Sequence, residues 1–245
     1  MKRLLFVFPH PDDESFACAG TLAKCHEAGH ETYLVCATSG GKGKSGAFSF
    51  SCGEELARHR EQELLKAAAI LGVNRTVLFG FPDGGLASHD FQEIVERITA
   101  TIVEIKPDVI VTFPPDGVTG HPDHIALSKA TEQAVLQAES SLAPGQGCDF
   151  YYVSIPHYYD HCKEKGPAAA VPITGKVDVT RFREKKGEAL RAHQSQVYSV
   201  NRAYPGVMEG DFGVIGSYEY YTLVRAQGRA VQPAAPEGGI PVIEL

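Results

Sequence analysis

Two short motifs of histidine and aspartate are the part of this chain best suited to chemistry. The first motif, HPDD, spans residues 10–13 and directly follows the apolar run at 4–8. The second motif, HPDH, spans residues 121–124 and follows the apolar run at 109–113. Two imidazoles and one carboxylate can bind a catalytic zinc ion and leave a coordination position open for water. The two motifs therefore predict a metal site built from segments far apart in the chain.

The residues of the two motifs can divide the work of a metal-dependent hydrolysis. Because neighbouring side chains at a strand end point in different directions, one of Asp12 and Asp13 can bind the metal while the other faces the nucleophile. A metal lowers the pKa of its water toward about 7, and a carboxylate can then remove the proton. His121 and Asp123 fit a histidine, oriented by a carboxylate, that supports an oxyanion or protonates a leaving group. The alternative, that both motifs are proline-rich turns with aspartate caps, explains neither their repetition nor their histidines.

Apolar runs alternate with helical patterns over the first two thirds of the chain. Strands are expected at 3–8, 31–37, 76–81, 108–113 and 150–155, and helices at 16–27, 54–71, 91–105 and 123–139. This alternation predicts an α/β fold with a mostly parallel sheet and helices on both faces. The carboxyl ends of parallel strands share one edge of the sheet. The polar residues that follow strands, including Asp83, Asp116 and His157, are therefore expected to converge with the two motifs.

The alternation weakens after residue 156. A short strand at 177–179, a helix at 181–193 and an aromatic strand at 218–224 are expected there. No repeat and no convincing linker divides the chain, so we expect one domain over 1–226. The proline- and glycine-rich residues 227–245 are expected to form a tail or arm.

Composition excludes several classes of protein. The chain has 245 residues, is 43% hydrophobic and carries a net charge of −7, with its lysines and arginines scattered. It can bury one large core or at most two modest ones, and it lacks the basic patch that nucleic-acid binding requires. Its apolar stretches are far shorter than the roughly 18 residues of a membrane span, and its first residues do not fit a signal peptide. Six cysteines without a CxxC pair favour a reduced, soluble, cytoplasmic protein.

The motifs resemble those of a known family. HPDDE at 10–14, followed about 110 residues later by HPDH at 121–124, is similar to the PIG-L/LmbE-like N-deacetylases. The segments REQEL at 60–64, DGGL at 83–86 and AHQSQ at 192–196 also resemble segments of that family, so the likeness covers roughly residues 1–200. Its members remove acetyl groups from N-acetylglucosaminyl compounds, including precursors of mycothiol and bacillithiol.

The resemblance implies a Rossmann-like fold and a role for each motif residue. The implied metal ligands are His10, Asp13 and His124, with Zn²⁺ as the metal and Fe²⁺ or another divalent ion as the alternative. Asp12 would be the general base, and His121, paired with Asp123, the electrophilic or acid group. The implied substrate contacts are Arg60 and Asp83, with His193 near the site.

Simpler interpretations of the implied substrate contacts stay open. Arg60 could be an exposed helix charge, with Arg58 taking its role, and Asp83 could be a turn residue. His193 could be a surface residue of its helix. His157 matches no segment of the family and is a candidate pocket residue only.

A glycine-rich segment matches the pattern of a nucleotide-binding motif but lacks its structural context. GKGKSG at 41–46 satisfies the pattern GxGxxG, but it follows the second expected strand and no helix starts directly after it. A dinucleotide site needs that helix N-terminus to meet the pyrophosphate. We therefore expect residues 39–53 to form a mobile loop that closes over the site.

Together these observations predict a zinc-dependent N-deacetylase of an N-acetylglucosamine-containing small molecule, with a bacillithiol-type precursor as one candidate. One alternative is a metal-dependent hydrolase of another amide, an ester or a phosphoester. Another is a non-catalytic sugar- or metal-binding protein, although binding alone does not require a base at Asp12. The expected partner is a small glycoside, and a homo-oligomer is compatible with the sequence.

Overall fold

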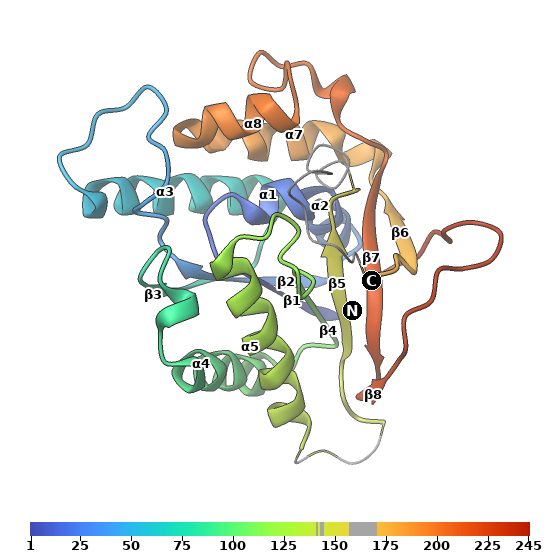
Figure 1. Cartoon of the computed structure of the whole chain (residues 1–245). Coiled ribbons are helices and arrows are strands. Elements are labelled where there is room, and N and C mark those ends of the chain that lie inside the picture. Colours follow the sequence, from blue (N-terminus) through green and yellow to red (C-terminus); the bar gives the residue numbers. More distant parts are fainter. Residues whose placement is uncertain (141, 143–144, 157–170) are drawn as a thin grey trace.

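The chain folds around one mixed β-sheet, as the computed structural model in Figure 1 shows. The structure describes residues 1–140, 142, 145–156 and 171–245, so His157 lies outside the described residues. The strand order is β3-β2-β1-β4-β5-β7-β6, and β8 pairs with β7. The strands are β1 (Arg3–Phe8), β2 (Glu31–Thr38), β3 (Arg75–Phe81), β4 (Val109–Thr112), β5 (Asp149–Ser154), β6 (Gly175–Asp178), β7 (Tyr218–Ala226) and β8 (Arg229–Ala230).

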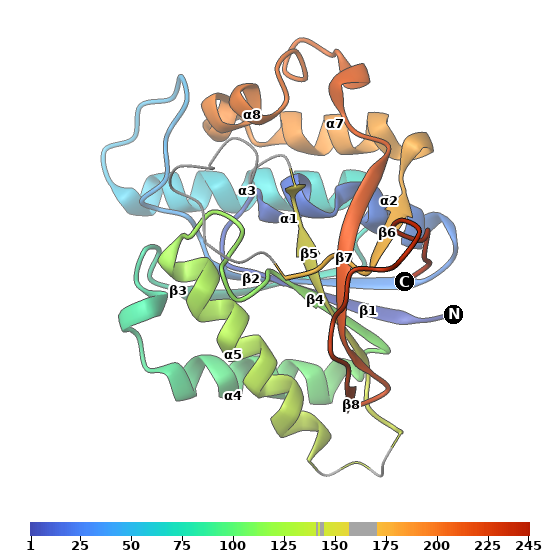
Figure 2. The same ribbon diagram turned by 45° about the vertical axis from the view of Figure 1, so that its right-hand side comes forward.

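Helices cover both faces of the sheet, as the alternating pattern predicts. The α-helices among the described residues are α1 (Asp13–Ala17), α2 (Ala19–Glu27), α3 (Gly53–Leu71), α4 (Phe91–Ile105), α5 (Pro122–Glu139), α7 (Arg183–Ala192) and α8 (Val197–Ala203). The helices α4 and α5 cover one face, and the other five lie on the opposite face (Figures 1 and 2). No helix in the described ranges is long and apolar enough to cross a membrane.

Apolar side chains on both faces of the sheet explain why it sits between two helical layers. Along β1, Leu4, Phe6 and Phe8 pack into the core under α1, α2 and α3, whereas Leu5 and Val7 pack into the core under α4 and α5. All five are buried, because alternate side chains of a strand point to opposite faces. A strand covered on both faces reads as a continuous apolar run, which is the pattern at 4–8.

The direction of the strands fixes where a site can form. Strands β1 to β5 pair in parallel, and β7 is antiparallel to both β5 and β6. The chain adds β2 and β3 on one side of β1, and β4 and β5 on the other. Such a reversal opens a crevice beyond the carboxyl ends of the central strands. The HPDD motif follows β1 and the HPDH motif follows β4, so both motifs flank this crevice.

The C-terminal residues pack against the sheet. The Lys176 N–H of β6 donates to Pro241 O at 2.9 Å, and the Ile243 N–H donates to Lys176 O at 2.8 Å. The C-terminal Leu245 is buried. The proline- and glycine-rich tail expected from the sequence therefore covers the outer edge of β6, where free backbone groups would otherwise be exposed.

Candidate active site

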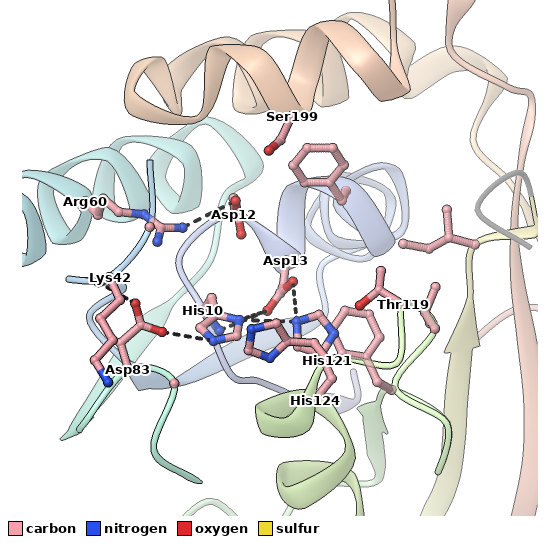
Figure 3. Close-up of a pocket in the computed structure, with 16 residues that line it drawn as sticks. His10, Asp12, Asp13, Lys42, Arg60, Asp83, Thr119, His121, His124 and Ser199 are labelled. Carbon is pink, nitrogen blue, oxygen red and sulfur yellow. Dashed lines mark hydrogen bonds and ion pairs between the residues drawn. The ribbon is translucent and has the colours of Figure 1, made fainter. Parts of the chain in front are cut away.

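A cavity of about 260 Å³ lies at the carboxyl edge of the sheet (Figure 3). Most of the site residues predicted from the sequence line it, and they come from the turn after β1, the start of α1, α3, the loop after β3 and the start of α5. They are His10, Asp12, Asp13, Arg60, Asp83, His121 and His124. Asp123 and His193 do not line this cavity.

Three side chains point their ligand atoms at one spot in this cavity. His10 Nδ1 lies 3.2 Å from His124 Nε2 and 3.5 Å from Asp13 Oδ2, and His124 Nε2 lies 3.5 Å from Asp13 Oδ1. Ligands about 2.1 Å from a tetrahedral zinc ion are about 3.4 Å apart, so the spacing suits such an ion. His121 joins the cluster, because it, His10 and His124 offer nitrogen atoms within 4.8 Å of one another.

The two buried imidazoles make hydrogen bonds through the nitrogen that faces away from the cluster, and this suits them to metal binding. His10 Nε2 lies 3.2 Å from Asp83 Oδ1 and 3.2 Å from Asp123 Oδ2, and His124 Nδ1 lies 3.0 Å from Gly117 O. A proton on each of these nitrogens leaves His10 Nδ1 and His124 Nε2 as the free lone pairs. Carboxylates and carbonyls on the far nitrogen commonly orient histidine ligands in this way.

The protonation of the imidazoles differs although they are neighbours. Burial lowers the pKa of His10, but hydrogen bonds to Asp123, Asp13 and Asp83 raise it to about 11. Burial lowers the pKa of His124, and this outweighs the charge of Asp13. A cation bound at the three side chains must therefore displace a proton from His10, whereas His124 is already in its ligand form.

The Asp123 carboxylate does not orient His121, which corrects the expected pairing. It is fully buried and accepts hydrogen bonds from the N–H groups of Gly84 at 2.7 Å and Leu86 at 3.0 Å, in addition to its contact with His10. The Asp123 backbone N–H donates instead to His121 Nδ1 at 3.1 Å, because His121 is the N-cap of α5. An accepting Nδ1 places the proton of a neutral His121 on Nε2, which is then a donor.

Asp12 stands beside this cluster, at the turn between β1 and α1. Its backbone has a φ of 122°, outside the range that side chains favour. Burial raises the pKa of its carboxyl to about 7, although the charge of Arg60 opposes this and that of Asp13 adds to it. A carboxyl that titrates near neutrality can accept and return a proton at physiological pH.

Arg60 reaches into the cavity from α3, so it is not an exposed helix charge. It is buried, whereas Arg58 is exposed. Its guanidinium lies 3.3 Å from Asp12 Oδ2 and donates to Pro11 O and to Gly40 O, the latter at 2.9 Å. A Cβ at Gly40 would lie 2.2 Å from Arg60 Nη1, so only glycine allows this close approach.

Asp83 connects the cavity to the glycine-rich loop. One carboxylate oxygen contacts His10, and the other accepts a hydrogen bond from the Lys42 N–H at 2.7 Å. Burial raises the pKa of Asp83, but the hydrogen bonds from His10 and Lys42 lower it to about 2. Gln196 Nε2 donates to Lys44 O at 2.7 Å, which ties the loop to the segment before α8 as well. The loop therefore borders the cavity, and its closure over substrate stays a prediction.

His193 does not line the cavity, although a place near the site and a substrate contact were expected for it. Its exposed fraction is 0%, and its Nε2 lies 2.8 Å from Glu14 Oε1. The end of α7 packs against α1, so the imidazole meets the buried Glu14 carboxylate and not the cavity. Three polar lining residues were not named as site residues from the sequence: Lys42 in the glycine-rich loop, Thr119 before α5 and Ser199 on α8. Lys42 lies in the loop at 39–53 that was expected over the site, although the residue itself was not named, and Ser199 carries no sequence signal.

Comparison with known sequences matches the chain to one protein family. The PIG-L family model, described as GlcNAc-PI de-N-acetylase, matches residues 5–135. A probable N-acetyl-alpha-D-glucosaminyl L-malate deacetylase 2 from Bacillus anthracis is 34% identical over 196 residues, which are 80% of this chain and 81% of that protein. A 1D-myo-inositol 2-acetamido-2-deoxy-alpha-D-glucopyranoside deacetylase from Saccharomonospora viridis is 31% identical over 263 residues, covering 91% of this chain and 95% of that protein.

Solved structures share the fold. N,N'-diacetylchitobiose deacetylase from Pyrococcus horikoshii aligns with a TM-score of 0.64 at 21% identity, over 91% of this chain and 83% of that one. The 4-carboxy-2-hydroxymuconate hydratase from Pseudomonas putida aligns with a TM-score of 0.65 at 19% identity, over 96% of this chain and 100% of that one. Because a deacetylase and a hydratase both have this architecture, the fold alone does not decide the reaction.

Proposed function

Because this chain belongs to the PIG-L family of GlcNAc-PI de-N-acetylases, we propose that it hydrolyses the acetamide of an N-acetylglucosamine-containing small molecule to a free amine and acetate. Two relatives are named deacetylases of an N-acetylglucosaminyl malate and of an inositol 2-acetamido-2-deoxy-glucopyranoside, so the acetamido sugar is what their substrates share. The observation that carries the proposal is the convergence of His10, Asp13 and His124 beside Asp12.

The proposed metal ligands are His10 Nδ1, the Asp13 carboxylate and His124 Nε2. Their spacing and the groups behind both imidazoles suit a divalent ion, with zinc as the first candidate and Fe²⁺ as the alternative. Such an ion would acidify water and polarise a carbonyl oxygen. The cluster of His10, Asp83 and Asp123 is the weaker candidate, because backbone N–H groups already occupy both oxygens of Asp123.

Asp12 is proposed to be the general base. It lies in the cavity next to Asp13, and its pKa near neutrality lets it take a proton from the attacking water. Arg60 holds one carboxylate oxygen of Asp12, which limits how far the base can swing. The proton that Asp12 accepts is then available to the departing amine.

His121 is proposed to face the acetyl carbonyl oxygen. The Asp123 backbone N–H fixes Nδ1 of the imidazole as an acceptor, so Nε2 carries a proton that can be donated. A donor in this position stabilises the negative charge that develops on the carbonyl oxygen during attack. This role does not require a carboxylate behind the imidazole.

Arg60 and Asp83 are the proposed contacts for the sugar. Both line the cavity, one with a guanidinium and the other with a carboxylate that can accept bonds from hydroxyl groups. The part of the substrate beyond the sugar stays open, and the malate and inositol conjugates of the relatives are its first candidates.

The test is acetate release from N-acetylglucosaminyl malate, N-acetylglucosaminyl inositol and free N-acetylglucosamine, measured with the zinc-loaded and iron-loaded proteins. We expect at least one conjugate to be hydrolysed. We expect Asp12→Asn to keep its bound metal but to lose about 10²- to 10⁴-fold in kcat, because it lacks the base. We expect His10→Ala to lose the metal. Wild-type turnover by Asp12→Asn would contradict the proposed mechanism.

A further inference from the structure

The backbone of Asp12 needs outside support to keep its conformation. Its φ of 122° and ψ of −28° lie in a region that residues with a side chain rarely adopt. Strained backbones of this kind persist only where neighbouring groups hold them. The Asp12 carbonyl is held by the N–H groups of Ser15 and Phe16, at 2.9 and 3.0 Å, as α1 begins. The Asp12 N–H has a different partner.

Glu14 holds that N–H from inside the protein. The Asp12 N–H donates to Glu14 Oε2 at 3.1 Å, so the Glu14 side chain bends back over the turn. The other oxygen, Oε1, accepts from the Ser15 hydroxyl and lies 2.8 Å from His193 Nε2. Only 1% of Glu14 is exposed. A carboxylate buried this deeply keeps its place only if it is paired and hydrogen-bonded.

His193 is the partner that reaches Glu14 from a distant part of the chain. It follows α7, and its Nε2 contacts Glu14 Oε1 and also lies 3.2 Å from the Ser15 hydroxyl. Its Nδ1 is buried without a hydrogen-bond partner among the described residues. The polar contacts of this imidazole are therefore directed at the Glu14–Ser15 pair, and none of them reaches the cavity.

We propose that Glu14 and His193 are positioning residues for Asp12. His193 holds the Glu14 carboxylate in place, and Glu14 in turn holds the N–H of the strained Asp12 backbone. The Asp12 carboxylate therefore stays between Arg60 and the cluster of His10, Asp13 and His124. The inference rests on the proposed function in one respect: its effect on rate requires Asp12 to be the general base.

The test compares two substitutions at one position. His193→Gln keeps an N–H donor in reach of Glu14, whereas His193→Leu removes it. For His193→Leu we expect kcat to fall roughly 10- to 100-fold, because small displacements of a reacting group cost that much. We expect its KM and bound metal to stay close to those of the wild type. His193→Gln is expected to recover most of the loss.

Two further variants separate positioning from stability. Tyr221→Phe removes a buried hydrogen bond of 2.6 Å to Thr21, away from the cavity, and shows how much kcat depends on stability alone. If His193→Leu does not fold, Glu14→Gln takes its place, because it weakens the same contacts and leaves no unpaired buried charge. Its amide can present an oxygen to only one of Asp12 and His193, so we expect kcat to fall here too.

Crystal structures of the wild type and the variants give a readout that is independent of activity. We expect Asp12 to keep a positive φ in the wild type and in His193→Gln, and to lose it in His193→Leu or Glu14→Gln. The proposal is overturned if Asp12 keeps its φ and its Arg60 contact in these two variants, or if kcat is unchanged. If the wild type releases acetate from no conjugate, the proposed function fails, and the Asp12 geometry still decides this inference.

Discussion

Three aspartates around the cavity differ in pKa because their neighbours differ. Burial raises the pKa of Asp12 to about 7, since Arg60 only partly offsets it. Burial acts on Asp13 too, but His124 and His10 outweigh it and lower its pKa. Hydrogen bonds lower the pKa of Asp83 to about 2. Surroundings that push the pKa values of chemically identical side chains apart suit them to different roles. Here Asp12 can accept a proton, whereas Asp13 and Asp83 stay ionised.

The pH dependence of activity should report the surroundings of Asp12. A general base must be ionised, so kcat/KM should fall as the pH drops through the pKa of Asp12. A divalent ion beside the carboxyl favours its ionised form, which places this acid limb below pH 7 in the metal-loaded protein. Arg60→Gln removes the charge that lowers the pKa of Asp12, and we expect the limb to move to higher pH.

The pH profiles of the wild type and of Arg60→Gln measure this shift at saturating metal. Arg60 is also a proposed substrate contact, so its loss can lower kcat/KM at every pH. The test therefore depends on the pH at which kcat/KM falls, and not on the maximum value of kcat/KM. A limb that stays in place, or moves to lower pH, would show that Asp12 is not the titrating group.

Residue types and spacing predicted which side chains meet at the site, but not the direction in which each one points. His10, Asp12, Asp13, His121 and His124 all line the cavity, because their motifs follow strands that end at one edge of the sheet. The orientations of Asp123 and His193 depend on tertiary contacts. Asp123 is buried against the loop at 84–86, and His193 against Glu14, and neither contact leaves a local signal in the sequence.

At the scale of elements, a break between α1 and α2 creates a buried anion site. The sequence predicts one helix over 16–27, but the backbone turns out of helical geometry at Cys18, and α2 starts afresh. The new N-terminus offers the N–H groups of Gly20 and Thr21 to Glu219 on β7, at 3.0 and 2.8 Å. Lys186 of α7 completes the pairing, 2.8 Å from Glu219 Oε1. This group joins α2, α7 and β7.

Lys186→Met should therefore destabilise the protein by about 3–5 kcal/mol, because Glu219 would remain buried without its counter-charge. Lys186 and Glu219 are both nearly inaccessible to solvent, so water cannot take over the role of the partner. Urea unfolding followed by circular dichroism measures the change. The double variant Lys186→Met/Glu219→Gln removes both charges and should regain much of the loss. A single variant as stable as the wild type would contradict this account.

The sequence predicted the parallel half of the sheet better than the rest. Strands β1 to β5 lie within about two residues of their expected positions, because each is a largely apolar run with a clear boundary. The aromatic strand at 218–224 was also expected, but its place was not. It enters as β7 between β5 and β6, antiparallel to both. Only long-range pairing decides that position, and periodicity does not encode it.

At the scale of the whole molecule, the site joins two halves of the sheet. His10 and Asp13 follow β1, and His124 lies on α5, which follows β4 on the other side of the reversal in strand order. The helix α1 belongs to one helical layer and α5 to the opposite one (Figure 2). An ion bound by these three side chains would therefore link the two helical layers.

Metal removal should for this reason lower the stability of the entire fold and not that of one loop. A ligand that binds only the folded state adds about 4 kcal/mol at a concentration 1,000 times its Kd, so Tm should rise with added zinc and fall with a chelator. Thermal unfolding of the wild type and of His124→Ala, each with zinc and with chelator, measures this. The Tm of His124→Ala should hardly respond, because only His10 and Asp13 remain of the proposed ligand set. An equal response of both proteins would mean that the ion binds elsewhere, since the lost imidazole would then have contributed nothing to its affinity.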